Sequence, residues 1–279
     1  MLVSVSIRHM FARAVAVPEE DIDLGTVALL IAKEEYADLD VRAYVARLDD
    51  MAAKVRPAAG ALGDPRRIVE AVNAFLFERE GFRGNAGEYY DPRNSFLNDV
   101  LDRKLGIPIT LSLVYMEVGR RIGFPMAGIG MPGHFLLKPS VGRAEWYIDA
   151  FNRGQVLTVE ECAQRVQSLY QGRVPFRPEF LATINKRQFL YRMLANLKAI
   201  YLGQKDLPRG IGAIERMLAL NPDNPEDVRD RGLVLAQAGQ YTQATAALER
   251  YLKLSPQADD AEPVKEAIET IWRMMAGLN

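Results

Sequence analysis

The chain has 279 residues, of which 49% are hydrophobic and 25% are charged, the balance of a folded globular protein rather than a disordered one. This length exceeds that of one typical domain and is sufficient for two, each with its own core. The formal net charge is −1, so bulk charge gives no reason to expect nucleic acid or an anionic membrane as a partner.

The first seventeen residues are apolar in patches, but Arg8, His9 and Arg13 interrupt them. The uncharged run is therefore too short for the apolar part of a signal peptide. No stretch of the sequence approaches the ~18–20 uncharged apolar residues of a membrane span. The only cysteine, Cys162, cannot form an intramolecular disulfide, which fits a reducing compartment. We therefore expect a cytoplasmic protein that does not enter a membrane.

Residues 22–54 carry apolar side chains at helical spacing and predict packed helices. Asp64 followed by Pro65 is a typical helix start, and Gly81 marks where that helix should stop. Residues 81–106 begin as a glycine-rich loop. We expect a helix from Asn94 or Ser95, either of which can cap it, to Gly106.

The segment from Ile109 to Ile122 predicts a second helix of a different kind, because apolar residues occupy nearly all of its sides. Such a helix lies at the centre of a core. The periodicity then changes to that of strands, over 127–137 and 145–151. Helices followed by an antiparallel meander predict an α+β fold that is predominantly helical.

From residue 184 onward the strand pattern ends and the chain repeats itself. Gly210 corresponds to Ala244, Met217 to Tyr251, and Asn221-Pro222 to Ser255-Pro256, each at an offset of 34 residues. This period, with small residues at the helix contact and proline after the second helix, is typical of tetratricopeptide repeats. We expect two repeats and a final capping helix at about 261–277.

His134 and Asp149 are the best candidates for chemistry. His134 follows Met131-Pro132-Gly133, and Asp149 lies near the end of the next predicted strand. Adjacent antiparallel strands could set this carboxylate beside the imidazole, as enzymes of the Cys-His-Asp type require. A structural role is the alternative, because a lone histidine more often serves packing and a strand-end aspartate often bonds turn amides.

Two segments resemble the transglutaminase-like family of bacterial proteins named after SirB, in which this core is coupled to tetratricopeptide repeats. They are DPRNSFLNDVLDRKLGIPITLSLVYMEVGRRIGFPMAGIGMPGHFLLKP at 91–139 and WYIDAFNRG at 146–154. The resemblance implies a papain/transglutaminase-like core with a small antiparallel sheet over residues 1–183. An all-α repeat domain would then follow over residues 184–279. It also gives His134 the place of the catalytic base and Asp149 that of its orienting partner.

In active relatives of this kind, a cysteine at the start of the central helix is the nucleophile, and the resemblance places that position on Pro108. Proline has no atom that attacks a carbonyl. Cys162 lies beyond both partners in the sequence, in the first turns of a later helix. Thr110 is a closer hydroxyl and an alternative nucleophile, although most hydroxyls on helices cap or bond back to the backbone.

Two hypotheses of different classes remain. The first is a non-catalytic scaffold or regulatory protein that binds a protein or peptide partner, with Tyr89, Tyr90, Arg93 and Asn94 bordering the cleft. The second is a residual hydrolase or acyl-transfer enzyme that uses His134 and Asp149 with Thr110 or an activated water. The sequence shows no phosphate loop, dinucleotide fingerprint or zinc spacing, so we expect neither a cofactor nor a metal.

Overall fold

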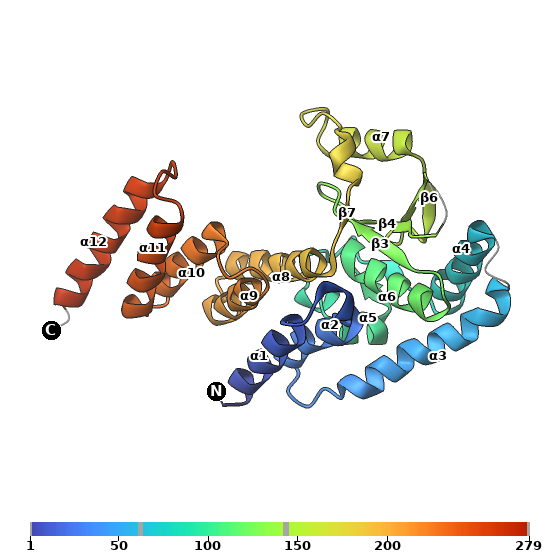
Figure 1. The fold of residues 1–279 in the computed structure, drawn as a ribbon, viewed down its shortest axis with the longest axis horizontal. Helices are drawn as coiled ribbons and strands as arrows, with labels where there is room; N and C mark the ends of the chain where they lie inside the picture. Colours follow the sequence, from blue (N-terminus) through green and yellow to red (C-terminus); the bar gives the residue numbers. More distant parts are fainter. Residues whose placement is uncertain (1, 61–63, 142–144, 278–279) are drawn as a thin grey trace. The chain divides into compact units, whose positions relative to one another are not determined.

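The computed structural model describes residues 2–60, 64–141 and 145–277. The chain divides into two compact units, Met1–Met193 and Leu194–Asn279. Figure 1 shows the elements of both units along the sequence. Helix α8, Lys186–Gly203, contains the division between the units.

The first unit is mainly helical. Its α-helices before α8 are α1 (Leu2–Val15), α2 (Leu24–Lys33), α3 (Val41–Ala59), α4 (Pro65–Asn73), α5 (Leu97–Arg103), α6 (Pro108–Arg121) and α7 (Val159–Leu169). Shorter helical segments are η1 (Glu19–Asp21), η2 (Ala74–Arg79), η3 (Pro92–Asn94) and η4 (Pro178–Leu181). Of these, η2 is a π-helix that continues α4.

A five-stranded antiparallel sheet accompanies these helices, in the order β6-β5-β4-β3-β7. Its strands are β3 (Met126–Ile129), β4 (Leu136–Pro139), β5 (Tyr147–Asp149), β6 (Gln155–Leu157) and β7 (Thr183–Ile184). A separate parallel pair joins β1 (Arg83–Gly84) to β2 (Leu105–Gly106). The α+β, predominantly helical class predicted from the sequence is confirmed.

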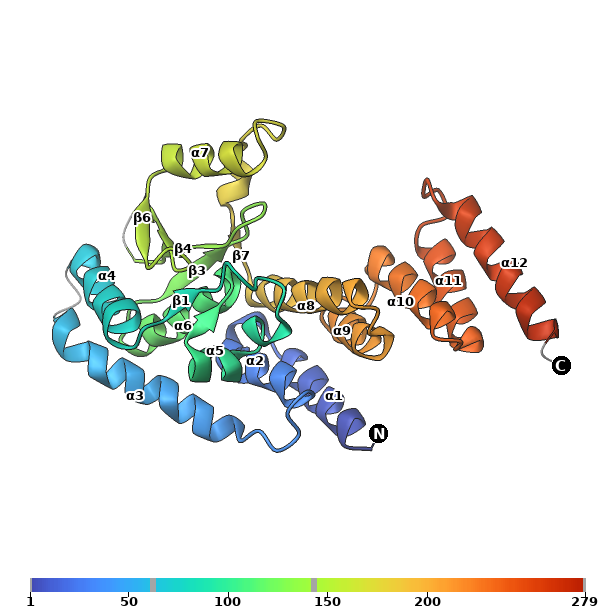
Figure 2. The same cartoon turned by 180° about the vertical axis from the view of Figure 1, so that it is seen from behind.

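Helix α6 is the centre of the first unit, as its apolar wheel predicts. It packs against β3 and β4 of the sheet and against α3, α4 and α5, an arrangement that Figure 2 shows from behind. Nearly all of its residues from Pro108 to Gly119 are buried. On the side of α7, Cys162 and Val166 join an apolar cluster with sheet residues that include Leu136 and Tyr147. The sheet is therefore buried by α6 and by α7.

The predicted start of the α4 helix is confirmed. Asp64 accepts a hydrogen bond from the backbone N–H of Arg66 at 2.9 Å, and Pro65 is the first helical residue. The chain leaves η2 at Gly81, which has a φ of 77°, a conformation that glycine adopts without strain.

Three expectations about local structure were wrong. Neither Asn94 nor Ser95 caps α5, which begins at Leu97 after Phe96, because both side chains are buried in the preceding turn. The segment 127–137 is not one strand but β3, a turn, and β4. The expected strands ended at residue 151, but two more strands follow. Strand β6 pairs with β5, and β7, which ends at Ile184, pairs with β3.

The second unit contains only helices within its described residues. They are the end of α8, then α9 (Leu207–Leu220), α10 (Pro225–Gln237), α11 (Tyr241–Leu254) and α12 (Ala261–Gly277). Helices α9 and α11 begin and end 34 residues apart, which is the repeat period read from the sequence. A Cβ on Gly210 would lie 2.7 Å from Cδ2 of Leu202. The small residue therefore allows α9 to approach α8 closely.

Candidate functional site

The turn between β3 and β4 brings His134 to Asp149. Gly133 has a φ of 67°, and the N–H of His134 closes the turn on the carbonyl of Met131 at 3.1 Å. Strand β4 then pairs with β5, which ends at Asp149. His134 Nε2 lies 2.8 Å from Asp149 Oδ2. The two residues singled out in the sequence are therefore in direct contact, through neighbouring antiparallel strands as expected.

Asp149 is fully buried and has several partners besides His134. Its Oδ1 accepts from the backbone N–H groups of Phe151 and Asn152, both at 3.1 Å. Its Oδ2 accepts from Asn152 Nδ2 at 2.9 Å and forms an ion pair with Arg165 of α7. A buried carboxylate needs such partners to remain charged. The turn-bonding role and the imidazole-orienting role, which the sequence left as alternatives, therefore occur together.

His134 is held as a neutral imidazole. Its side chain is only 11% exposed. Burial, together with the positive charges of Arg165 and Arg192, lowers the pKa of His134 to about 4. At neutral pH, Nε2–H therefore donates to Asp149, and Nδ1 is left as an acceptor. Arg192 of α8 also donates to the carbonyl oxygens of Met131 and His134, at 3.3 and 3.2 Å, so it fixes the turn that carries the ring.

A run of aromatic rings leads away from His134. The ring of Phe151 meets that of His134 edge to face at a centroid distance of 6.1 Å, and Tyr89 meets Phe151 at 6.4 Å. Tyr90 packs on Tyr89 at 5.4 Å and is itself 74% exposed. The aromatic run, defined as His134, Phe151, Tyr89 and Tyr90, thus connects the buried pair to the surface. It includes both tyrosines named in the sequence analysis.

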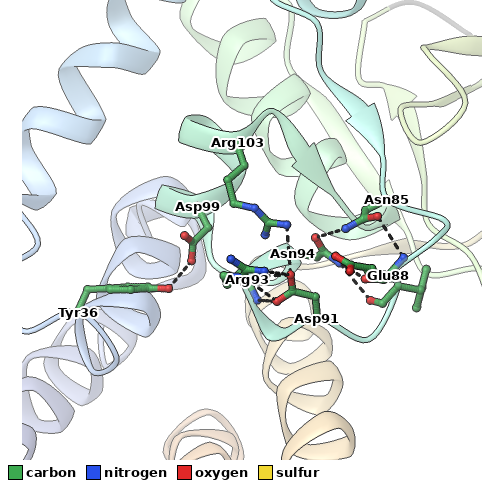
Figure 3. A network of polar contacts seen from close by, with 9 residues as sticks. Tyr36, Asn85, Glu88, Asp91, Arg93, Asn94, Asp99 and Arg103 are labelled. Atoms are coloured by element: carbon green, nitrogen blue, oxygen red, sulfur yellow. Dashed lines mark hydrogen bonds and ion pairs between the residues drawn. The ribbon is translucent and has the colours of Figure 1, made fainter.

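The other two residues of that loop have different surroundings, which Figure 3 shows from close by. Arg93 pairs with Asp91, which also accepts from Arg103 at 3.2 Å. Asn94 is fully buried. Its Nδ2 donates to the carbonyl oxygen of Glu88 at 2.7 Å, and its Oδ1 accepts from Asn85 at 3.1 Å. Asn94 therefore holds the loop together and does not present its amide to a ligand.

The start of α6 contains no free nucleophile at the two positions considered in the sequence. Pro108 is the first helical residue and is buried. The hydroxyl of Thr110 is also buried; it donates to the carbonyl oxygen of Asn94 at 2.7 Å and accepts from the N–H of Ile107 at 3.1 Å. It thereby satisfies one of the backbone N–H groups that are free at a helix start. The structure therefore gives Thr110 the structural role that the sequence analysis weighed against nucleophilic attack.

Cys162 lies in the apolar cluster between α7 and the sheet and is fully buried. Burial and the nearby Glu161 and Glu160 raise the pKa of its thiol to about 11. Since the thiolate is the reactive form, this cysteine is protonated and inert at neutral pH.

Sequence reasoning missed four residues that build the site: Phe151, Asn152, Arg165 and Arg192. Phe151 and Asn152 are within the segment WYIDAFNRG and could have been found as the residues of a turn that follows a strand. Arg165 and Arg192 are single arginines on helices far along the chain, and no local pattern distinguishes them from surface residues. In the described ranges, no group of three or more His, Cys, Asp or Glu side chains is placed to hold a metal ion. Nor does any described helix have the length and apolarity to cross a bilayer.

Comparisons with known proteins define the class of protein. The profile of the transglutaminase-like superfamily matches residues 42–195, and a tetratricopeptide-repeat profile matches residues 197–269. The chain is 38% identical over 252 residues to a UPF0162 protein of Xylella fastidiosa (strain 9a5c), covering 89% of this chain and 90% of that protein. The chain belongs to the UPF0162, or SirB-like, family of transglutaminase-like proteins with tetratricopeptide repeats.

More distant relatives match a large part of the chain. A UPF0162 protein of Vibrio cholerae is 26% identical over 209 residues, covering 75% of this chain and 77% of that protein. The F-box only protein 21 of Mus musculus is 33% identical over 196 residues, covering 63% of this chain but only 28% of that larger protein. No solved structure matches the chain significantly.

Proposed function

We propose that this protein is a non-catalytic transglutaminase-like scaffold of the cytoplasm that recognises a protein or peptide partner. The observation that carries the proposal is the aromatic run from His134 to the exposed Tyr90. Rigid aromatic side chains provide a large contact area at a small entropic cost, and they are enriched among the residues that dominate binding energy.

The imidazole at the buried end of this run is suited to recognition. Its Nε2–H is committed to Asp149, and its low pKa keeps Nδ1 unprotonated at neutral pH. Nδ1 can therefore accept a hydrogen bond from an amide or hydroxyl of a bound peptide. Tetratricopeptide repeats generally offer extended surfaces for protein partners, so the second unit supports the same class of function.

Three residues argue against acyl transfer by attack of a side chain. Pro108 has no nucleophilic atom, Thr110 uses its hydroxyl within the helix start, and Cys162 is buried as a thiol. A residual hydrolase is the second candidate, and the contact of 2.8 Å between His134 and Asp149 favours it. In that reaction Nδ1 would accept the proton of an attacking water.

The binding proposal is tested with peptides selected from a random display library on the purified full-length chain. We expect Tyr90→Ala to weaken the selected peptides by at least about tenfold, the effect of removing a binding hot spot. Trp272→Ala is the matched control, because Trp272 is an exposed aromatic residue of the repeat unit. If only Trp272→Ala weakens binding, the peptides bind the repeats and the proposed role of the aromatic run is wrong.

The hydrolase candidate is tested on a panel of esters and peptides. Wild-type protein and His134→Ala are compared after their unfolding curves show that both are folded. Turnover by the wild type that is lost in His134→Ala would establish an enzyme. Equal background rates in the two proteins would support the scaffold.

A further inference from the structure

Helix α5 borders a pocket that has no part in the site described above. The pocket lies between the end of α2, the start of α3 and α5, and has a volume of about 530 Å³. Its lining residues are Glu35, Tyr36, Ala37, Asp38, Leu39, Tyr44, Asn98, Asp99 and Asp102. We call it the α5 pocket. Four of its lining side chains are carboxylates and none is cationic, so it favours a positively charged occupant.

Two of the lining residues, Tyr44 and Asp102, already bind a guanidinium group, that of Arg47, which is not itself part of the lining. The hydroxyl of Tyr44 donates to Asp102 Oδ2 at 2.6 Å. Arg47 forms an ion pair with Asp102, and its Cζ lies 5.0 Å from the centre of the Tyr44 ring. A carboxylate and an aromatic ring together are a suitable environment for a guanidinium, which forms directed hydrogen bonds and stacks on ring faces.

Another two of the lining residues repeat the same pair of residue types without the arginine. The hydroxyl of Tyr36 donates to Asp99 Oδ2 at 2.7 Å. Across the described ranges of the chain, Asp99 has no ion pair within 4.0 Å. Burial raises the pKa of this carboxyl. The nearest arginines, Arg93 and Arg103, are both bound to Asp91, as Figure 3 shows.

Asn98 is a second and independent sign of a missing partner. It lines the same pocket and is 5% exposed. Its Oδ1 has no hydrogen-bond partner among the described residues. A buried acceptor without a partner destabilises the folded chain, and a donor bound in the pocket would supply that partner. Lys33, two residues before Glu35, donates to the carbonyl oxygens of Ala37 and Leu39, and Lys104, six residues after Asn98, is paired with Glu80.

We propose that the α5 pocket binds an external guanidinium group, with Tyr36 and Asp99 taking the roles that Tyr44 and Asp102 have toward Arg47. The ligand is either an arginine side chain of a partner protein or a small guanidinium compound. This site does not depend on the aromatic run, so either proposal can fail without the other.

The test uses three probes with the full-length ¹⁵N-labelled chain: acetyl-Gly-Arg-Gly-amide, its lysine counterpart, and methylguanidinium. We expect the arginine peptide to shift the backbone amide signals of residues 35–39 and 98–102. The lysine peptide should bind at least about threefold more weakly, because an ammonium group lacks the planar fork of the guanidinium. Methylguanidinium binding as tightly as the peptide identifies a site for small compounds, and tighter peptide binding identifies a site for an arginine side chain.

Two variants complete the test. Asp99→Asn keeps the shape of the side chain but removes its charge, and should weaken the arginine peptide by at least about fivefold. Glu262→Gln removes a carboxylate of α12 whose ion pair is with Lys265, and should leave binding unchanged. The proposal is overturned if the wild-type shifts lie outside the two segments, if lysine binds as well as arginine, or if a folded Asp99→Asn binds normally. The wild-type shifts decide the matter if Asp99→Asn does not fold.

Discussion

The start of α6 and the turn before β4 use their polar groups in different ways. At the start of α6, Pro108 has no nucleophilic atom, and the hydroxyl of Thr110 is hydrogen-bonded to the backbone around it. In the turn before β4, His134 and Asp149 retain a direct contact that orients the ring, and the aromatic run connects the ring to the surface. The turn before β4 therefore keeps an oriented imidazole near the surface, whereas the start of α6 has its polar groups bound to the backbone, and the proposal of a binding function rests on this difference.

The largest expected loss of stability comes from removing the carboxylate of Asp149, which binds His134 and the turn after β5. Asp149→Ala should lower the free energy of unfolding by about 3–5 kcal/mol, because it removes the carboxylate that pairs with the half-buried Arg165 and leaves the N–H groups of Phe151 and Asn152 without their acceptor. Urea denaturation measures this loss. Glu269→Ala, at an exposed residue paired with Arg273, should change stability by less than about 0.5 kcal/mol. A similarly small effect at Asp149 would mean that its network is not formed.

Two replacements of Thr110 at the start of α6 separate the contribution of its hydroxyl from that of its methyl group. Thr110→Val keeps the shape but leaves the N–H of Ile107 and the carbonyl of Asn94 unpaired, and should cost about 2–3 kcal/mol. Thr110→Ser keeps the hydroxyl and should cost about 1 kcal/mol, through the lost methyl group. Unfolding curves of both variants measure the difference. Equal losses would show that the hydroxyl contributes nothing to the helix start.

Stability should depend on pH through His134. Its pKa is about 4 in the folded chain and about 6.5 in the unfolded chain. The unfolded state therefore binds the proton first as the pH falls. Stability should drop by about 2 kcal/mol between pH 7 and pH 5 and level off below pH 4. His134→Gln should lack this component, because an amide can still donate to Asp149 but does not titrate. Parallel pH curves of the two proteins would contradict the neutral imidazole.

Long, strongly patterned elements were predictable from the sequence. The central helix was expected over 109–122 and occupies Pro108–Arg121, since its composition and its limits at proline and glycine are local signals. The repeat offset of 34 residues likewise predicted where α9 and α11 lie. For the central helix the signal lies in neighbouring residues, and for the repeats it lies in a constant offset along the sequence.

The expectations that were wrong depended on contacts between distant segments. The cap of α5 was misassigned because Asn94 bonds Asn85 and the carbonyl of Glu88 instead. The strand β7 exists because it pairs with β3, more than fifty residues earlier. The contact between His134 and Asp149 was predictable from the strand order. The arginines around it were not, because Arg165, which pairs with Asp149, belongs to α7, and Arg192, which donates to the carbonyl oxygen of His134, belongs to α8.

We propose that no hydroxyl or thiol of the folded chain acts as a nucleophile beside the imidazole of His134. Intact-protein mass spectrometry after incubation with p-nitrophenyl acetate and with iodoacetamide at neutral pH tests it most directly. We predict that the native protein retains its unmodified mass and that Cys162 is alkylated only after unfolding in urea. A covalent adduct on any hydroxyl or thiol of the native chain that disappears in His134→Ala would contradict the account.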